Sequence, residues 1–291
     1  MDPALNPYAP GAGTRPPVLT GRDAEIDVFR VAIARLAAGR PARSVVLSGL
    51  RGVGKTVLLN EFDVIGREAG WVTSDVVECN EDDTLGELMA RLAWRALRRL
   101  SRGKRLSSDV RRALGVLKAF TVTADSHGRW ALNLDVDAVS GTADSGDLEH
   151  DIVELLDAVG RAATAKASGM LILLDELQFL GRDDLRRLAG AFHRMSQEEH
   201  PVLMAAAGLP QLPLALAQAK PYSERLFTDR EVGSLRPAAA RAALLTPATR
   251  AGVRFSDAAL KRVIAASSGY PYFLQQWGEA VWNEAVGSEI T

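Results

Sequence analysis

The sequence predicts an α/β protein in which a parallel sheet is covered by helices on both faces. Fully apolar runs at 45–47, 170–174 and 201–207 alternate with longer segments whose apolar residues recur at helical spacing. A glycine-rich loop at 49–56 joins the first run to one of those segments. Strands buried on both faces of a parallel sheet read as continuous apolar runs, and their alternation with helices is typical of α/β folds.

Length and composition fit a soluble globular protein with room for one large and one small domain. The chain has 291 residues, of which 47% are hydrophobic, and its net charge of −1 provides no overall field that would attract nucleic acid. Its single cysteine, Cys79, excludes an internal disulfide and a zinc site built from cysteines. The sequence shows neither a long uncharged apolar stretch nor a secretion signal, so we expect a cytoplasmic protein with no membrane partner.

The first 18 residues are rich in proline and glycine, which predicts an extended lead rather than a helix. A helix is expected from about residue 20 to Ala38, because Ile26, Phe29 and Ile33 recur on one face. Gly39 would end that helix.

Residues 49–56 read GLRGVGKT and fit the phosphate-loop pattern G-x-x-x-x-G-K-[ST] at every constrained position. Such a loop turns tightly at its glycines and presents backbone N–H groups to a phosphate at the start of a helix. Lys55 would reach the β- and γ-phosphates, and the Thr56 hydroxyl would bind Mg²⁺. A strand before the loop and helical spacing after it favour this interpretation over a turn that binds nothing. The expected nucleotide contacts from this segment are Gly49, Gly52, Val53, Gly54, Lys55, Thr56 and Val57.

Between the loop helix and residue 170 the pattern is less regular. Residues 91–112 are strongly basic. We interpret them as a solvated helix face opposite the acidic residues at 135–151, and contact with nucleic-acid phosphates as the less favoured alternative. The expected elements are a strand, a helix, a hairpin and a second helix, at 71–77, 84–100, 120–134 and 148–167 respectively.

A buried strand that ends in two acids predicts the catalytic half of a nucleotide site. Residues 171–174 are apolar and lead directly to Asp175 and Glu176, which is the Walker B pattern. Asp175 would hold Mg²⁺, directly or through water, and Glu176 would orient and polarise the attacking water. The plainer interpretation of Asp175 is a helix cap or a surface acid.

Two further positions bear on the rate of turnover. The strand at 201–207 ends without the asparagine, serine or threonine that often senses a γ-phosphate in phosphate-loop ATPases. Gln211 is only a weak substitute, so we expect slow hydrolysis. Arg225 precedes the last short strand, where an arginine can meet a γ-phosphate; Arg230 is the alternative, and a solvated charge is the plainer interpretation.

After residue 235 the strand pattern stops, and three helices are expected at 237–245, 257–266 and 271–286. These helices form a small all-α unit. The chain would therefore divide into an extended lead at 1–18, an ATPase core at 19–234 with an insertion at about 91–146, and a helical lid at 235–291.

With these motifs the chain resembles the AAA+/STAND branch of phosphate-loop ATPases, in particular the origin-recognition-like AAA ATPase domains of many bacterial ATP-binding proteins. The resemblance covers roughly residues 18–287 and rests on the phosphate loop, LTGRDAE at 19–25, DELQ at 175–178 and GYP at 269–271. It implies a five-stranded sheet in the order 5-1-4-3-2 with a helical lid. It also implies that Gly21 and Arg22 lie near the adenine and ribose, and Pro271 near the base. Relatives commonly add a winged helix after the lid, and because this chain stops at Thr291 we do not expect a DNA-reading module.

The motifs and the resemblance together predict an ATP-binding switch protein with slow, Mg²⁺-dependent ATP hydrolysis, in which ATP or ADP sets the angle between core and lid. The alternative is a non-hydrolysing, nucleotide-dependent binding module or a DNA-associated helper protein. GTP is disfavoured because the sequence contains no Asn-Lys-x-Asp, and a kinase because it suggests no acceptor site. A protein partner is expected but not identified, and nucleotide-dependent self-association stays open.

Overall fold

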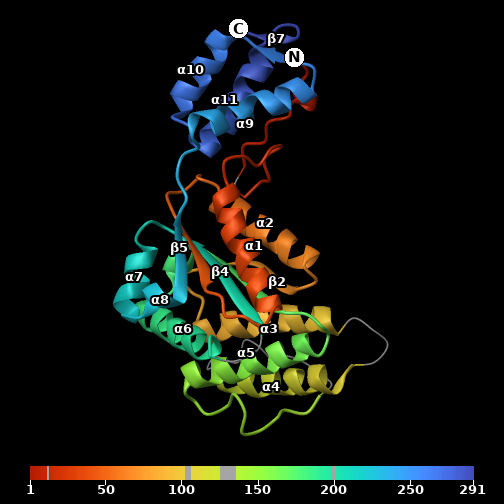
Figure 1. The fold of residues 1–291 in the computed structure, drawn as a ribbon, viewed down its shortest axis with the longest axis vertical. Helices are drawn as coiled ribbons and strands as arrows, with labels where there is room; N and C mark the ends of the chain where they lie inside the picture. The colour runs from red at the N-terminus through yellow and green to blue at the C-terminus, as the bar shows by residue number, and fades with distance from the viewer. Residues whose placement is uncertain (12, 102–105, 125–135, 198–200) are drawn as a thin grey trace. The chain divides into compact units, whose positions relative to one another are not determined.

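The computed structural model describes residues 1–11, 13–101, 106–124, 136–197 and 201–291 (Figure 1). The chain forms two compact units, each built from separated segments. The loop unit comprises residues 1–27, 49–58 and 231–291, and the sheet unit comprises residues 28–48 and 59–230.

Five strands form one sheet in the order β2-β3-β4-β1-β5 (Figure 1). β1 pairs with β4, β4 with β3, and β3 with β2, in each case in parallel. Read from the other edge, this is the order 5-1-4-3-2, so the predicted phosphate-loop α/β fold is confirmed. The strands are β1 Ser44–Ser48, β2 Val72–Glu78, β3 Met170–Asp175, β4 Val202–Gly208 and β5 Phe227–Glu231.

Helices cover both faces of the sheet, as the apolar strands predict. Every residue of β1, β3 and β4 is buried. Along β3, Ile172 and Leu174 belong to an apolar cluster that includes α3 and α5, whereas Leu171 points to the other face and lies close beneath Gly66 of α2. In the sheet unit Phe29 of α1 stacks on Phe62 of α2 with ring centroids 4.0 Å apart. The helices are α1 Asp23–Ala37, α2 Lys55–Glu68, α3 Leu85–Leu100, α4 Ser108–Ala124, α5 Leu148–Thr164, α6 Arg182–Met195, α7 Leu212–Ala219 and α8 Ser223–Leu226.

The predicted hairpin at 120–134 is wrong in its first half, because α4 continues to Ala124. The β-branched residues at 121–123 favour a strand locally, but Val110, Leu117 and Phe120 are fully buried against neighbouring helices. That helical burial outweighs the local preference. The second half of the predicted hairpin, at 125–134, lies outside the described residues.

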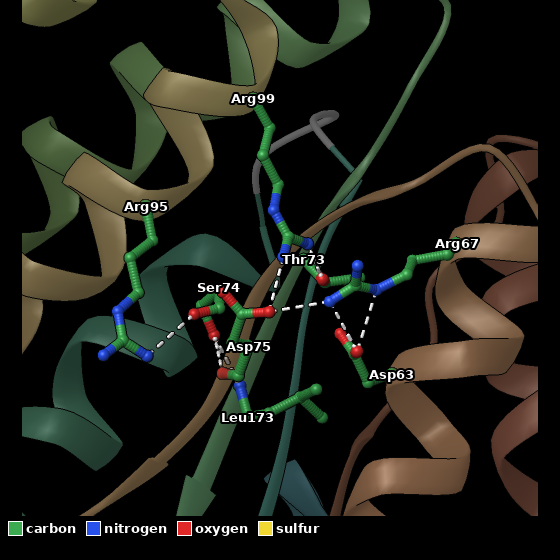
Figure 2. A network of polar contacts seen from close by, with 8 residues as sticks. All are labelled: Asp63, Arg67, Thr73, Ser74, Asp75, Arg95, Arg99 and Leu173. Carbon is green, nitrogen blue, oxygen red and sulfur yellow. Dashed lines mark hydrogen bonds and ion pairs between the residues drawn. The ribbon is translucent and has the colours of Figure 1, made fainter.

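Two arginines of the basic segment at 91–112, Arg95 and Arg99, bond to the edge strand β2. The chain of β2 is irregular between Thr73 and Val76, and Asp75 adopts a left-handed backbone with φ of 58°. Figure 2 shows Arg67 of α2 and Arg99 of α3 converging on the Asp75 carboxylate, with an Arg67 Nη2 to Asp75 Oδ1 distance of 2.7 Å.

The polar groups at this irregularity are hydrogen-bonded by β3 on one side and by α3 on the other (Figure 2). The Leu173 N–H of β3 donates to Ser74 Oγ at 3.1 Å, and the Arg95 guanidinium lies 3.4 Å from the Ser74 carbonyl oxygen. Arg99 also donates to Thr73 Oγ1. Arg95 and Arg99 therefore do not face the acidic stretch as a solvated helix face, because their acceptors belong to the bulge in β2.

Three helices follow residue 235, as predicted: α9 Pro237–Arg250, α10 Asp257–Ser267 and α11 Pro271–Glu284. The expectation that strands stop there is wrong in one detail. The two-residue strands β6 Arg254–Phe255 and β7 Glu289–Ile290 pair in parallel. Elements this short leave no periodic pattern in the sequence.

The N-terminal lead packs onto α11 within the loop unit. It contains one 3-10 turn, η1 Pro3–Leu5. The Tyr8 side chain is 4% exposed, and its hydroxyl donates to the Leu244 carbonyl oxygen at 2.6 Å. Its ring lies so close to Gly278 of α11 that a Cβ there would come within 2.6 Å of it. The lead is thus part of the core of the loop unit. Across the described part of the chain, no helix is long and apolar enough to cross a membrane.

Candidate nucleotide-binding site

The glycine loop joins the end of β1 to the start of α2 through two left-handed residues, Gly52 with φ of 79° and Gly54 with φ of 96°. At Gly54, apart from the adjoining backbone and chain neighbours, no heavy atom of the described residues lies within 4 Å of the position that a Cβ would take. The first-turn N–H groups of a helix have no intrahelical acceptor and favour negative charge. The open space at Gly54, directly before Lys55, therefore fits a phosphate group.

The other side of the loop is covered by residues of the loop unit. A Cβ at Gly49 would lie 2.2 Å from the Val232 carbonyl oxygen, so only glycine fits there. A Cβ at Gly52 would lie 3.1 Å from Tyr272 Cβ and 3.2 Å from the Tyr270 ring. The glycines thus serve two purposes: Gly54 leaves an open face, and Gly49 and Gly52 allow close packing behind it.

Lys55 is only 5% exposed, and its ammonium group folds back on the loop. Nζ donates to the carbonyl oxygens of Gly49 and Leu50, each at 2.9 Å. These acceptors hold the charge at the loop itself, where phosphate oxygens are expected. Thr56 lies beside the N-terminal lead, since a Cβ at Gly13 would be 3.2 Å from Thr56 Cγ2.

Arg22 links the phosphate loop to residue 233 through two hydrogen bonds. Its side chain is 6% exposed, and Nη2 donates to the Val53 carbonyl oxygen at 2.9 Å and to the Gly233 carbonyl oxygen at 2.6 Å. Burial lowers the pKa of Arg22, and the nearby Glu25 carboxylate acts in the opposite direction. A buried guanidinium that donates to two carbonyls fixes the separation of the segments that carry them.

The neighbouring Gly21 is also constrained, with φ of 67° and with a would-be Cβ only 2.6 Å from Ala239 Cβ. The family resemblance associates Gly21 and Arg22 with the adenine and ribose, and that role stays a prediction. What the structure adds is that Arg22 donates to the backbone of the phosphate loop.

The turn before α11 also contacts the loop, through two residues that sequence reasoning missed. Tyr270 donates its hydroxyl to the Arg51 carbonyl oxygen at 2.5 Å, and the Tyr272 N–H donates to the Gly52 carbonyl oxygen at 3.2 Å. Pro271, the residue singled out by the sequence, is the first residue of α11, where its missing N–H costs no hydrogen bond. The signal that could have identified the two tyrosines is their position on either side of that proline.

The acidic turn at the end of β3 lies in the sheet unit. Asp175 is 4% exposed and accepts the Glu176 N–H on Oδ1 at 2.9 Å. Glu176 is left-handed, with φ of 53° and ψ of 39°, and precedes the short 3-10 helix η2 Leu177–Phe179. Gln178 donates Nε2 to Glu176 Oε2 and accepts the Leu209 N–H on Oε1 at 3.1 Å.

The predicted site residues fall into both units. The loop unit holds Gly21, Arg22, Gly49, Gly52, Val53, Gly54, Lys55, Thr56, Val57 and Pro271, and the sheet unit holds Asp175, Glu176 and Arg225. Arg225 is exposed in α8, next to β5, and Gln211 is exposed at the start of α7. The roles of all these residues remain predictions.

The residues expected to hold Mg²⁺ provide single oxygen donors. Among the residues with described positions, no group of three or more histidine, cysteine, aspartate or glutamate side chains could hold a metal ion. Mg²⁺ in nucleotide sites is usually held by one or two protein oxygens together with phosphates and water. The Thr56 hydroxyl and the Asp175 carboxylate are oxygens of the required kind.

Residues 18–205 match the family model of the AAA ATPase domain. The chain belongs to this family. As an AAA ATPase it is placed among nucleotide-binding ATPases, which typically use Mg²⁺. No curated protein gives a sequence match.

Solved structures share this fold. The ORC2 protein of Aeropyrum pernix, in its ADP form, has a TM-score of 0.53 and 13% identity over 91% of this chain and 63% of that chain. The RuvB Holliday junction branch migration motor of Thermotoga maritima has a TM-score of 0.51 and 14% identity over 94% and 66%. At such identities the likeness shows the fold alone. This AAA ATPase spans slightly less than two thirds of the length of those two chains.

Proposed function

We propose that this AAA ATPase is an ATP-binding switch with slow, Mg²⁺-dependent hydrolysis. The observation that carries the proposal is the construction of the loop unit, in which the phosphate loop, the segment around Arg22 and the turn before α11 form one compact body. Arg22 and Tyr270 both donate to carbonyl oxygens of the loop. A ligand that rearranges the loop must therefore also act on the C-terminal helices.

In this proposal each residue of the nucleotide site has a separate role. Lys55 and the N–H groups from Gly54 onward bind the phosphates, and Thr56 offers its hydroxyl to Mg²⁺. Asp175 holds Mg²⁺ from the end of β3, and Glu176 orients the attacking water. Bound MgATP would supply the γ-phosphoryl group, and its Mg²⁺ would neutralise part of the negative charge of the phosphates. Arg225 serves as the arginine that faces the γ-phosphate.

The switch follows from the contacts behind the loop. Tyr270 and Tyr272 bond to consecutive carbonyl groups of the loop, those of Arg51 and Gly52. Phosphate binding that reorients either peptide breaks or strengthens these bonds, so nucleotide state biases the position of the helical lid at 235–291. A protein partner, or a second copy of the chain, would recognise the lid position.

A second candidate, a nucleotide-dependent binding module that does not hydrolyse ATP, is favoured by one observation. β4 ends in Ala207 and Gly208 and so offers no polar side chain of its own to a γ-phosphate. This candidate includes a DNA-associated helper role. It differs from the first in predicting ATP binding without turnover.

Two variants test the proposal. Lys55→Ala should weaken ATP binding by about 2–4 kcal/mol in calorimetry, because it removes a charge from a desolvated contact. Glu176→Gln should retain ATP binding and slow single-turnover hydrolysis by roughly a hundredfold or more. Unchanged affinity in Lys55→Ala would reject the phosphate-loop site, and ATP binding without turnover in the wild-type protein would favour the second candidate.

The lid is tested by hydrogen exchange. Both ATP and ADP should protect amides at 267–275, which lie far in sequence from Lys55, whereas residues around Arg225 should differ between the two nucleotides. If protection is confined to the segments around residues 21, 55 and 175, the C-terminal helices are a structural cap and the switch is rejected.

A further inference from the structure

The end of β4 lacks a polar side chain, yet a polar group occupies that position. The group is the side-chain amide of Gln178, whose Oε1 accepts the N–H of Leu209, the residue that follows β4, at 3.1 Å. Gln178 comes from the turn after β3, and β3 is the neighbour of β4 in the sheet. The amide therefore crosses between the ends of two adjacent strands.

The other end of the same amide holds Glu176, since Gln178 Nε2 donates to Glu176 Oε2. The orientation of the amide follows from its partners. A backbone N–H can only donate and an ionised carboxylate can only accept, so Oε1 must face Leu209 and Nε2 must face Glu176. A neutral side chain that both donates and accepts is required at 178.

Gly208 leaves the space that this bridge needs. A Cβ at residue 208 would lie 2.7 Å from Gln178 Oε1 and 2.7 Å from Leu212 Cδ2. Any side chain larger than hydrogen would push the amide away from Leu209. The absence of a side chain at the end of β4 is thus what allows the Gln178 amide to reach Leu209.

The Glu176 backbone is fixed as well as its carboxylate. Its N–H is bonded to Asp175 Oδ1 at 2.9 Å, and its φ of 53° is uncommon for a residue with a side chain. The Asp175 carbonyl oxygen in turn accepts the Cys79 N–H at 2.9 Å. With backbone and carboxylate both held, Glu176 retains little freedom to choose another direction.

We propose that Gln178 is a positioning residue for Glu176, which links the orientation of the water-activating carboxylate to the end of β4. The inference rests on the proposed function, because it assigns Glu176 to hydrolysis. The bridge takes the place of a polar side chain on β4 itself. Movement of residues 208–212 would then redirect the carboxylate and change the rate of hydrolysis without touching the phosphate loop.

The test is the kcat and KM for ATP of Gln178→Ala, with ATP affinity measured separately by calorimetry. We expect kcat to fall by about 10- to 100-fold, the scale of a misplaced catalytic group, while the Kd for ATP changes by less than about threefold. Gln218→Ala, at an exposed glutamine of α7, is the matched control and should behave as wild type. Gly208→Ala should reproduce the loss of kcat from the opposite side of the bridge.

Gln178→Glu adds a readout that a merely structural role would not move. At neutral pH two carboxylates would face each other and kcat should fall as in Gln178→Ala. Gln178→Glu keeps an acceptor for the Leu209 N–H but removes the donor to Glu176, so the Leu209 amide should keep its protection from hydrogen exchange while kcat falls. Wild-type kcat in Gln178→Glu overturns the proposal.

The outcomes separate this inference from the proposed function. If Glu176→Gln abolishes hydrolysis while Gln178→Ala and Gly208→Ala keep wild-type kcat, positioning by Gln178 is overturned and the proposed function stands. If Glu176→Gln turns over at the wild-type rate, the assignment of Glu176 fails and the inference fails with it. An increase of kcat in Gln178→Ala also overturns it, because the bridge would then restrain Glu176 rather than position it. Circular dichroism and the midpoint of thermal unfolding verify that each variant is folded.

Discussion

The glycine loop and the acidic turn carry the two strongest motifs of the chain, but the molecule supports them in different ways. The loop is held by residues far away in sequence: Arg51 accepts a bond from Tyr270, and Val53 one from Arg22. The acidic turn is held by bonds within the turn, through Asp175 and Gln178, and by Cys79 and Leu209 at the ends of the two strands beside β3. The acidic turn therefore keeps its geometry where β2, β3 and β4 are intact, whereas the loop depends on the folding of two distant segments, those of Arg22 and Tyr270.

The largest effect should come from Tyr8, which joins the N-terminal lead to the helices of the loop unit. Tyr8→Ala removes a buried ring that packs on Gly278 and should cost about 3–5 kcal/mol of unfolding free energy. Tyr8→Phe retains the ring and loses only the bond to the Leu244 carbonyl, at a cost of about 1 kcal/mol. Denaturant unfolding measures both variants.

Hydrogen exchange then shows which segments the Tyr8→Ala substitution destabilises. Amides of α9 and α11 should lose protection, while those of β3 keep it. Equal loss in the two units would mean that the loop unit has no separate stability, and the comparison between the two motifs would fail.

Cys79 reports on the region around the acidic turn. It follows β2, and its N–H donates to the Asp175 carbonyl oxygen. Burial raises the pKa of the Cys79 thiol to about 12, and the nearby Asp83 carboxylate adds to the shift. At pH 8 the thiolate fraction should be about a thousandfold smaller than for a thiol of pKa 9, because the thiolate fraction falls tenfold for each unit.

Native protein should therefore react with a thiol reagent about a thousandfold more slowly than unfolded protein, and the native rate should rise tenfold per pH unit between pH 7 and 9. The thiol is neutral in this range, so the pH dependence reports its ionisation. Rapid labelling at pH 7 would show that the region around the acidic turn opens readily and is no more rigid than the loop.

A smaller effect is expected at the loop itself. Gly52→Ala places a Cβ in a left-handed residue and against Tyr270 and Tyr272, whereas Gly39→Ala meets the same backbone cost with no heavy atom of the described chain within 4 Å. The backbone term is about 1–2 kcal/mol in both. Gly52→Ala should lose additional stability and about tenfold in ATP affinity, and Gly39→Ala should keep wild-type affinity. Equal results in the two variants would show that the tyrosines do not constrain the loop.

The same contrast explains what the sequence could predict. The strands β1, β3 and β4 are continuous apolar runs, and the loop pattern is contiguous, so both are visible in a single stretch of chain. The partnership of Arg22 with Val53, or of Tyr270 with Arg51, joins residues that only the fold brings together. Gln178 lies next to a recognised motif, but its role depends on knowing that β3 and β4 are neighbours and that Gly208 leaves room. The strand predicted at residues 120–123 is wrong for the same reason. The local sequence favours a strand, but the packing of Phe120 against other helices decides the secondary structure.

The smallest effect is expected for Tyr270→Phe, which removes one hydroxyl from the contact behind the loop. The bond to the Arg51 carbonyl lies at the surface and should contribute about 0.5–1 kcal/mol, so amide exchange at 50–54 should increase by about two- to fivefold. Tyr272→Phe is the matched control, since its contact with the Gly52 carbonyl uses the backbone N–H and survives the change. The Leu209 amide, which bonds to Gln178 in the other unit, should exchange as in wild type. If the Leu209 amide responded as strongly as the loop, the two motifs would share one cooperative support, and ATP bound at the loop could act on Glu176 directly through that support rather than through the C-terminal helices.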